Sequence, residues 1–231
     1  MRKILAILFA LSVLTACTAT ASADSEITVS GTGQVLVPAD TAVVSLGVSA
    51  TDREVLNAQA KANETIAAIR EALISRGISE GDINTDYINI YARYDYSDGV
   101  EQLTSYNANS TLAIRVDNID QVGEVIDTAF GAGANTLNGI SFSASDTKEA
   151  REEAMRAAVE DAKAKAQILA DAAGLQIRGI EEIAEQGTYS SERGSMNTFK
   201  AAAEDSAAGT VIQAAKLSVS STITVTFQVD R

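Results

Sequence analysis

The segment KLSVSSTITVTFQVD, residues 216–230, sets the fold class, because apolar and small polar side chains alternate along its length. One face of it comprises Leu217, Val219, Ser221, Ile223, Val225, Phe227 and Val229. A two-residue period is typical of a strand with one buried and one solvated face, the arrangement common in antiparallel sheets. We therefore expect an antiparallel sheet that needs helices to cover one side.

The segment AREEAMRAAVEDAKAKAQILADAAG, residues 150–174, supplies such a helix. The apolar period predicts a helix over 147–173 that ends at Gly174, a residue type favoured just past a helix end. The expected inward positions are Met155, Val159, Ala162, Ala166, Leu169 and Ala173. Because alanine is abundant in this segment, we expect the helix to approach a sheet or another helix closely.

The rest of the chain extends this pattern outward. Two strands are expected in 25–50, a helix from a Thr51–Glu54 capping box to Gly77, and a hairpin over 83–118 that turns at Asp98-Gly99. A short helix in 119–135 and strands in 136–145 and 175–186 complete the order ββαββ-αβα-ββ. This order predicts an α+β fold of mostly antiparallel sheets with two long helices and one short helix packed on them.

The first 23 residues are typical of an export signal. Arg2 and Lys3 precede an apolar run of 11 residues, Ile4 to Leu14, which is too short to span a bilayer. Cleavage after Ala16, at a lipobox ending in Cys17, would leave a lipid-anchored protein. Cleavage after Ala23, in an A-x-A site, would leave a soluble periplasmic one. The lipobox spacing favours lipidation of Cys17, and both readings leave the domain at 24–231.

Composition excludes several classes of function. The net charge is −13, and it becomes −15 once Arg2 and Lys3 are removed with the signal. Such a chain lacks the basic face that phosphate backbones require, so we expect no nucleic-acid partner and membrane contact only through a lipid on Cys17. The chain has no histidine and one cysteine, which excludes Ser-His and Cys-His triads. We expect no enzyme activity, no catalytic residues, no cofactor and no metal site.

Two short motifs have alternative interpretations. SGTGQV contains Gly31 and Gly33, but a strand continues after it in place of the helix that a phosphate loop requires, so a bulge or turn is expected. DYSDGVE brings Asp95, Asp98 and Glu101 together. These carboxylates do not fill the twelve-residue calcium-loop pattern, and a hairpin turn is favoured over a metal site.

The tyrosines form the candidate interaction site. Five of the six lie in 87–106, namely Tyr87, Tyr91, Tyr94, Tyr96 and Tyr106. Tyrosine is enriched at protein interfaces, although it also has a high intrinsic preference for strands. Because tyrosines fall on both faces of the first hairpin strand, at least one aromatic face should be exposed. A second feature is the stretch 187–210, which has no sustained period and is expected to be a long mobile loop.

Five segments together resemble a known family. They are ITVSGTGQVLVPADTAVVSLGV (27–48), LISRGISEGDINTDYINIYARYDY (73–96), VGEVIDTAFGAGANTLNGISFSASD (122–146), AREEAMRAAVEDAKAKAQILADAAG (150–174) and KLSVSSTITVTF (216–227). They are similar to segments of the SIMPL-domain family of exported bacterial proteins, which includes oxidative-stress-defence and periplasmic immunogenic proteins. One departure is VIQAAKL, residues 211–217, where the family usually has a proline–glycine turn.

The resemblance implies an α+β fold, an envelope location and assembly into oligomers, and it implies no catalytic residues. Together with the tyrosines, it leads us to expect a non-enzymatic protein on the periplasmic side of the cell envelope. Such a protein would act through self-association, as a homo-oligomer, or through an envelope protein partner, with a loose link to envelope or oxidative stress tolerance. The alternative is a carboxylate-based metal-binding or hydrolytic activity at Asp95, Asp98 and Glu101.

Overall fold

The computed structural model describes residues 25–97, 100–191, 209–214 and 216–231. Within these ranges the strands are β1 (Ser25–Val37), β2 (Thr41–Asp52), β3 (Ile83–Ser97), β4 (Val100–Val116), β5 (Thr136–Ser143), β6 (Gln176–Ser191) and β7 (Leu217–Asp230). The helices are α2 (Val55–Ser75), α3 (Val122–Gly131) and α4 (Lys148–Ala173), with single 3-10 turns η1 (Glu80–Asp82) and η2 (Ile119–Gln121). All strand pairs are antiparallel, so the predicted α+β class is confirmed.

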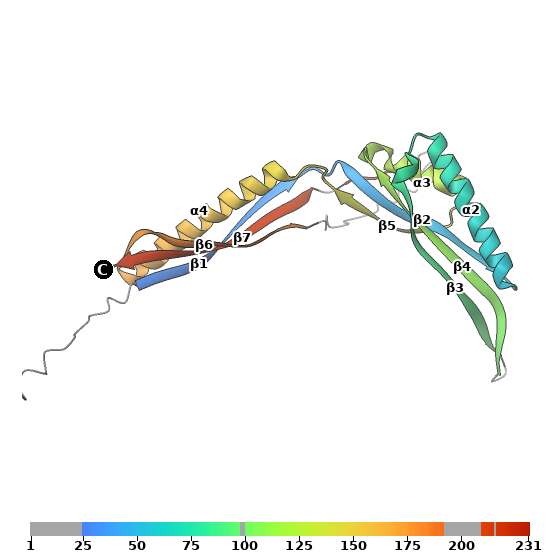
Figure 1. Ribbon diagram of the computed structural model, residues 1–231, viewed down its shortest axis with the longest axis horizontal. Helices are drawn as coiled ribbons and strands as arrows, with labels where there is room; N and C mark the ends of the chain where they lie inside the picture. The colour runs from blue at the N-terminus through green and yellow to red at the C-terminus, as the bar shows by residue number, and fades with distance from the viewer. Residues whose placement is uncertain (1–24, 98–99, 192–208, 215) are drawn as a thin grey trace, which may run out of the picture.

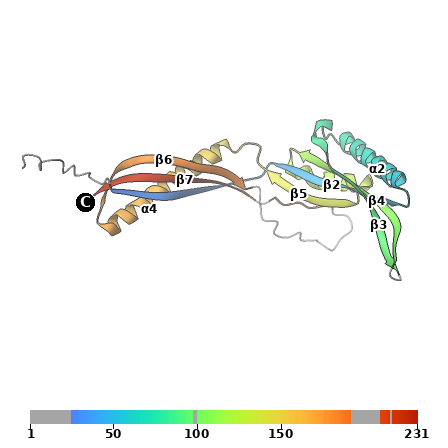
Figure 2. The same cartoon turned by 60° about the horizontal axis from the view of Figure 1, so that its bottom comes forward.

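The molecule is elongated and has two lobes, each made of one sheet and its covering helices (Figure 1). The first lobe has the sheet order β1-β7-β6 with α4 on one face, and the second has the order β3-β4-β2-β5 with α2 and α3. The second lobe is a continuous stretch, residues 41–143, inserted between β1 and α4 of the first. Figure 2 shows the same separation from another side.

In the first lobe, β7 is the central strand and alternates as predicted. Its odd-numbered residues are buried under α4, whereas the even-numbered serines and threonines lie on the opposite face. That face forms a polar ladder with β1, in which Thr28 and Thr226 share a hydrogen bond of 3.1 Å and Gln34 donates to Ser218 at 2.7 Å. A polar outer face explains why one layer of helix is enough to cover this sheet.

Gly31 and Gly33 lie within β1 and make neither a bulge nor a turn, contrary to expectation. The pairing of β1 with β7 runs from Ser25 to Val37 without a register shift. A Cβ atom on Gly31 would lie 2.0 Å from the carbonyl oxygen of Ala158, and one on Gly33 would lie 2.0 Å from that of Ala154. The glycines are therefore in the strand because α4 lies directly on it, and at these two positions it comes closer than a side chain would permit.

The face by which α4 contacts the sheet also differs from the prediction. The buried positions are alanines at four-residue spacing, here named the alanine stripe: Ala150, Ala154, Ala158, Ala162, Ala166 and Ala170. Met155 and Val159 are only partly buried, and Leu169 and Ala173 are exposed. Small side chains face the sheet because α4 lies so close to β1 at Gly31 and Gly33 that no larger side chain would fit between them. The predicted close approach of the helix to a sheet is confirmed.

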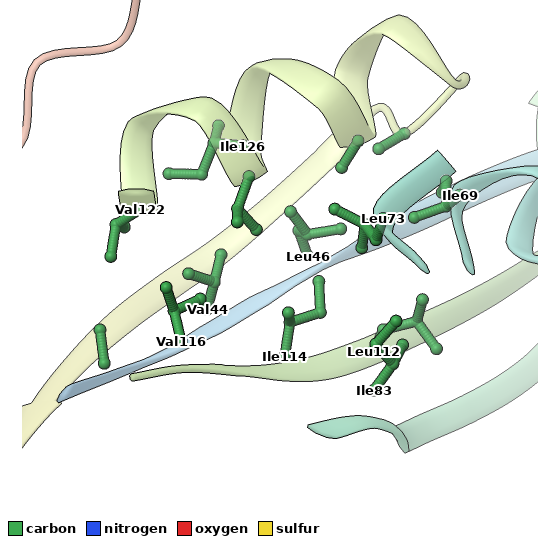
Figure 3. Packing of buried hydrophobic residues seen from close by; sticks show 14 residues of the cluster. Val44, Leu46, Ile69, Leu73, Ile83, Leu112, Ile114, Val116, Val122 and Ile126 are labelled. Carbon is green, nitrogen blue, oxygen red and sulfur yellow. The ribbon is translucent and has the colours of Figure 1, made fainter. Parts of the chain in front are cut away.

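The second lobe contains the larger core. Ile69 and Leu73 of α2 and Val122 and Ile126 of α3 face Val44 and Leu46 of β2 and Leu112, Ile114 and Val116 of β4 (Figure 3). These side chains are almost completely buried. Ala58, Ala62, Ile69 and Leu73 are the buried residues of α2, whereas Val55 at its start is exposed, as is Phe130 in α3. Both lie close to an end of their helix.

Several expectations concern residues outside the described ranges. They are the export signal 1–23 with Cys17, the turn residues Asp98 and Gly99, and the segment 192–208 of the expected loop. The loop boundary needs correction, since residues 187–191 belong to β6 and pair with Ser218 to Thr222 of β7. The sequence of 187–191 has no strand period of its own. These residues are in a strand because they pair with β7, which lies elsewhere in the sequence. Within the described ranges, no helix combines the length and apolarity needed to cross a bilayer.

Candidate interaction surface

The hairpin β3–β4 projects from the second lobe at the end of the molecule farthest from the start of β1 (Figure 1). Its two strands pair from Ile83 and Ile114 to Ser97 and Val100. The neighbouring strand β2 pairs with β4 only as far as Tyr106. Beyond that point the hairpin is a two-stranded ribbon, and in water such ribbons are at best marginally stable without a further contact.

The register places the tyrosines of β3 on both faces, as predicted. Ile90 packs with the cluster under α2, so Tyr94 and Tyr96, at even spacing from it, lie on the helix-bearing face. Tyr87 and Tyr91 alternate with Ile90 and lie on the opposite face, across from Thr111 and Asn107. A register shift between Arg93 and Tyr94 increases the local twist where the ribbon leaves the sheet.

Large side chains along the hairpin β3–β4 are exposed, and three of them, Tyr94, Tyr96 and Leu103, lie on the two-stranded ribbon. The exposed fractions are 55% for Tyr87, 61% for Ile88, 46% for Tyr91, 57% for Tyr94, 75% for Tyr96 and 48% for Leu103. We name these six residues the hairpin surface. Tyr94 and Tyr96 lie on one face of the hairpin, and Tyr87 and Tyr91 lie on the other. Large apolar and aromatic side chains that gather in solvent on one element are typical of a binding site. Ile88 and Leu103 were not singled out from the sequence, although their alternation with the tyrosines was a usable signal.

Tyr106 differs from the other four sequence-predicted tyrosines. It is half-buried and packs against the cluster of Val48, Ala58, Ala62 and Ala108. It lies at the last position where β2 still pairs with β4, across from Asp52. Tyr106 therefore anchors the base of the ribbon, and the structure does not place it in the hairpin surface.

The carboxylates near the turn do not converge. Glu101 pairs with Tyr96, whereas Asp95 pairs with Gln102 one position away, so the two side chains lie on opposite faces of the ribbon. Asp98 lies outside the described residues. Among the side chains that are described, no group of three or more His, Cys, Asp or Glu is close enough to hold a metal ion. This arrangement gives no support to a metal site built on Asp95 and Glu101.

A second concave feature lies between the end of α2 and α3, next to residues 209–210. It is an open cleft of about 840 Å³. Its charged groups are engaged in structural contacts: Arg76 pairs with Glu124, and Asp127 accepts hydrogen bonds from the amide and hydroxyl of Thr210. Glu124 and Asp127 thus each hold a neighbouring element, and these contacts assign the two carboxylates a structural role and not an acid–base one.

The carboxyl groups with lowered pKa values also serve structural contacts. The hydroxyl and amide of Ser145 lower the pKa of Asp40, and the ammonium of Lys165 and the amide of Thr32 lower that of Asp161. The Lys61 ammonium, with the Glu54 amide, lowers the pKa of Asp52 to about 2. All these shifts favour the charged form of the carboxylate, which suits a hydrogen-bond acceptor and not a general acid.

The family comparison agrees with the resemblance seen in the sequence. A family model described as SIMPL, protein of unknown function (DUF541), matches residues 27–227. The chain is 29% identical over 214 residues to the 26 kDa periplasmic immunogenic protein of Brucella melitensis, covering 89% of this chain and 85% of that protein. The corresponding Brucella abortus protein is 28% identical over the same length.

A further relative is the uncharacterized protein YggE of Escherichia coli strain K12. It is 28% identical over 145 residues, which cover 63% of this chain and 59% of YggE. The matched range of the family model extends from β1 to β7 and thus includes both lobes and the hairpin. The chain therefore belongs to the SIMPL family of proteins of unknown function.

Proposed function

We propose that this chain is an exported protein on the periplasmic side of the cell envelope and acts without catalysis, through self-association at the hairpin surface. The observation that carries the proposal is the exposure of tyrosine and aliphatic side chains on a two-stranded ribbon that projects from the body. The export signal read from residues 1–23 and the periplasmic names of the Brucella relatives support the location.

A second copy of the chain suits the free edge of this ribbon. β3 is the edge strand of its sheet, and edge strands present unpaired backbone groups to a partner. If two copies pair their β3 strands antiparallel about Tyr94, Arg93 of one copy lies across from Asp95 of the other, twice by symmetry. Opposite charges in directly facing positions stabilise strand pairs. The tyrosines on both faces would gain cross-strand neighbours from the other copy in the same step.

Light scattering on residues 24–231 over a range of concentrations tests self-association. Wild type should exceed the mass of a monomer, and either R93D or D95R alone should lower that mass by placing like charges across the pair. The double variant R93D/D95R, in which the charges are exchanged, should restore it. A wild type that stays monomeric at every concentration, or a double variant no better than the single ones, contradicts self-association through β3.

Binding of an envelope protein is the other use of the same surface. Capture from envelope extract with wild type and with Y94S/Y96S tests this use of the hairpin surface. If an envelope protein binds there, wild type should recover it and the variant should not. Calcium titration by calorimetry addresses the carboxylate alternative, for which we expect no heat.

A role in stress tolerance would be indirect. Cys17 is the only thiol of the sequence, and both readings of the signal modify or remove it, so the domain has no thiol to reduce peroxide. A deletion strain should become sensitive to envelope or oxidative stress and should be rescued by wild type but not by Y94S/Y96S. Peroxide consumption by purified residues 24–231 at an enzymatic rate would contradict the proposal.

A further inference from the structure

The two lobes meet through connecting segments and not through a shared core. The buried clusters of the first lobe are formed by β1, β7 and α4, and those of the second by β2, β3, β4, α2 and α3. Among the described residues, none of these clusters takes its buried members from both lobes. Close packing of a shared interface would fix the angle between the lobes. Because the described residues of the two lobes share no buried cluster, other contacts must fix that angle here.

The first such device ties together the two segments that follow β1 and β5. Asp40 accepts hydrogen bonds from the amide of Ser145 at 2.8 Å and from its hydroxyl at 2.6 Å. The Asp40 amide in turn donates to the carbonyl oxygen of Ser143 at 3.1 Å, next to a hydroxyl pair between Thr41 and Ser143 at 2.7 Å. We name the Asp40–Ser145 contact the Asp40 clamp.

The second device holds the segment that leads from residue 209 to β7. Asp127 of α3 accepts from the Thr210 amide at 3.0 Å and from its hydroxyl at 2.6 Å, a contact that we name the Asp127 clamp. Gly123 permits it, because a Cβ atom there would lie 2.1 Å from the Thr210 carbonyl oxygen. Ile212 then packs on the core of the second lobe before the chain enters β7 at Leu217.

We infer that the Asp40 and Asp127 clamps hold the two lobes at a fixed angle and that the junction becomes a hinge when they are broken. Each clamp is a carboxylate that accepts two hydrogen bonds from one residue, a geometry that is directional and stronger than neutral pairs. Three described segments connect the lobes: one follows β1, one follows β5 and one leads into β7. Together the two clamps attach all three segments to the second lobe. The direction of the hairpin relative to the first lobe follows from this angle, whether or not the hairpin binds a second copy.

Distance measurement between the lobes tests the inference. Residues 24–231 contain no cysteine, so spin labels can be placed at Ala67→Cys on α2 and Ala164→Cys on α4, two exposed helix positions. Double electron–electron resonance should give one narrow distance peak for wild type. The variant D40A/D127A should lose that narrow peak and show a broad distribution.

The matched control is D161A. Asp161 accepts from the amide of Thr32 at 2.7 Å and from its hydroxyl at 3.3 Å, the same pattern as in the Asp127 clamp, but inside the first lobe. This variant should keep the narrow peak. Circular dichroism shows whether the variants are folded. If D40A/D127A is unfolded, S145A/T210V is used instead; it keeps both carboxylates and loses the hydroxyl hydrogen bond of each clamp, so its peak should broaden less than complete loss of the clamps would cause but more than that of D161A. A narrow peak in the folded clamp variant, or a broad one in wild type, overturns the inference.

Discussion

At the residue scale, the closest contact in the first lobe depends on side chains that are absent or minimal. Gly31 and Gly33 of β1 lie against the carbonyl oxygens of Ala158 and Ala154 on α4. Next to Gly33, the paired residue of β7 is Ser221, which is buried and whose hydroxyl has no hydrogen-bond partner. The same closeness thus explains two glycines in a strand and a buried serine in an otherwise apolar row.

Replacing Gly33 by alanine should destabilise the first lobe. The added Cβ atom meets backbone and not a flexible side chain, so α4 or β1 must shift, and such overpacking costs about 1–3 kcal/mol in the free energy of unfolding. Urea unfolding measures this change. Gly179 of β6 is the matched control, because a Cβ atom there meets nothing within 4 Å. Equal effects of G33A and G179A would contradict the close-packing explanation.

Replacing Ser221 by alanine should stabilise the protein. The buried hydroxyl gives up its hydrogen bonds to water on folding and gains no partner among the described residues in return. Removing it should raise the free energy of unfolding by about 1 kcal/mol. The midpoint of urea unfolding should therefore rise for S221A. Ser218 is the comparison in the same strand, since its hydroxyl accepts from Gln34 and S218A should not stabilise. A lower midpoint for S221A would mean that the hydroxyl has a partner in solution.

At the element scale, helices are joined to sheets by carboxylates as well as by apolar faces. On α4, Asp161 accepts from the amide of Thr32 and Lys165 donates to the carbonyl oxygen of Ser30 at 3.0 Å. This ion pair satisfies backbone groups on the open edge of β1, which would otherwise be available to another strand. At the start of α2, Asp52 accepts from the Glu54 amide at 3.0 Å, in place of the capping box expected at Thr51.

The Asp52 contact should make stability depend on pH in the acid range. The Lys61 ammonium, with the Glu54 amide, lowers the pKa of Asp52 from 3.8 to about 2 in the folded protein. The carboxylate is therefore favoured on folding, and its contribution is present above pH about 4 and is lost as pH falls towards 2.

The variants D52N and K61Q test this. Both should unfold at a lower temperature than wild type at pH 6, and the difference should shrink as pH falls from 4 to 2 in a series of thermal unfolding curves. K61Q removes the Lys61 ammonium but leaves the Glu54 amide on the Asp52 carboxylate, so its pH profile should lie between those of wild type and D52N. A wild-type profile that runs parallel to that of D52N through this range would show that the contact does not contribute.

At the scale of the whole molecule, two sheets with separate cores share one chain. The second lobe is inserted between β1 and α4, and the first lobe closes only when β6 and β7, at the end of the chain, join β1. The hairpin surface lies at the far end of the second lobe (Figure 1). The separation of the cores leads us to expect that each lobe opens as its own cooperative unit.

Replacing Leu73 by alanine should loosen the second lobe alone. Leu73 is completely buried in the core of that lobe, and such a change costs about 2–5 kcal/mol. Hydrogen exchange measured by mass spectrometry should become faster in β2, β4 and α2 and stay unchanged in β7 and α4. G33A should show the reverse pattern. Equal acceleration in both lobes for either variant would show that the molecule unfolds as one unit.

Much of the fold could be read from local pattern. The strict alternation over 217–229 identified β7, and the period and terminal glycines identified α2 and α4 with almost correct ends. The inward face of α4 could not be read this way. Methionine, valine and leucine have larger apolar surfaces than alanine, so a hydrophobic period favours them, whereas the glycines of β1 make alanine the residue that fits.

The candidate site was only partly predictable. Aromatic clustering pointed to 87–106, and the alternation correctly implied two faces. What separated Tyr106 from Tyr94 and Tyr96 is the length of β2, which stops pairing at Tyr106. That limit is a property of a strand some 50 residues away in the sequence, so no local pattern near the tyrosines contains it.

The sequence by itself determined the α+β class, the element order, the family, and the exclusion of histidine- and thiol-based chemistry from residues 24–231. These follow from residue types and short periods, which act within a few residues of the chain. Only the tertiary structure decided that there are two lobes, that Gly31 and Gly33 serve close helix packing, that the ribbon beyond Tyr106 is uncovered, and that Asp40 and Asp127 join the lobes. Each of these depends on which distant strands pair and how near two backbones come, and those distances are set by the packing of the whole chain.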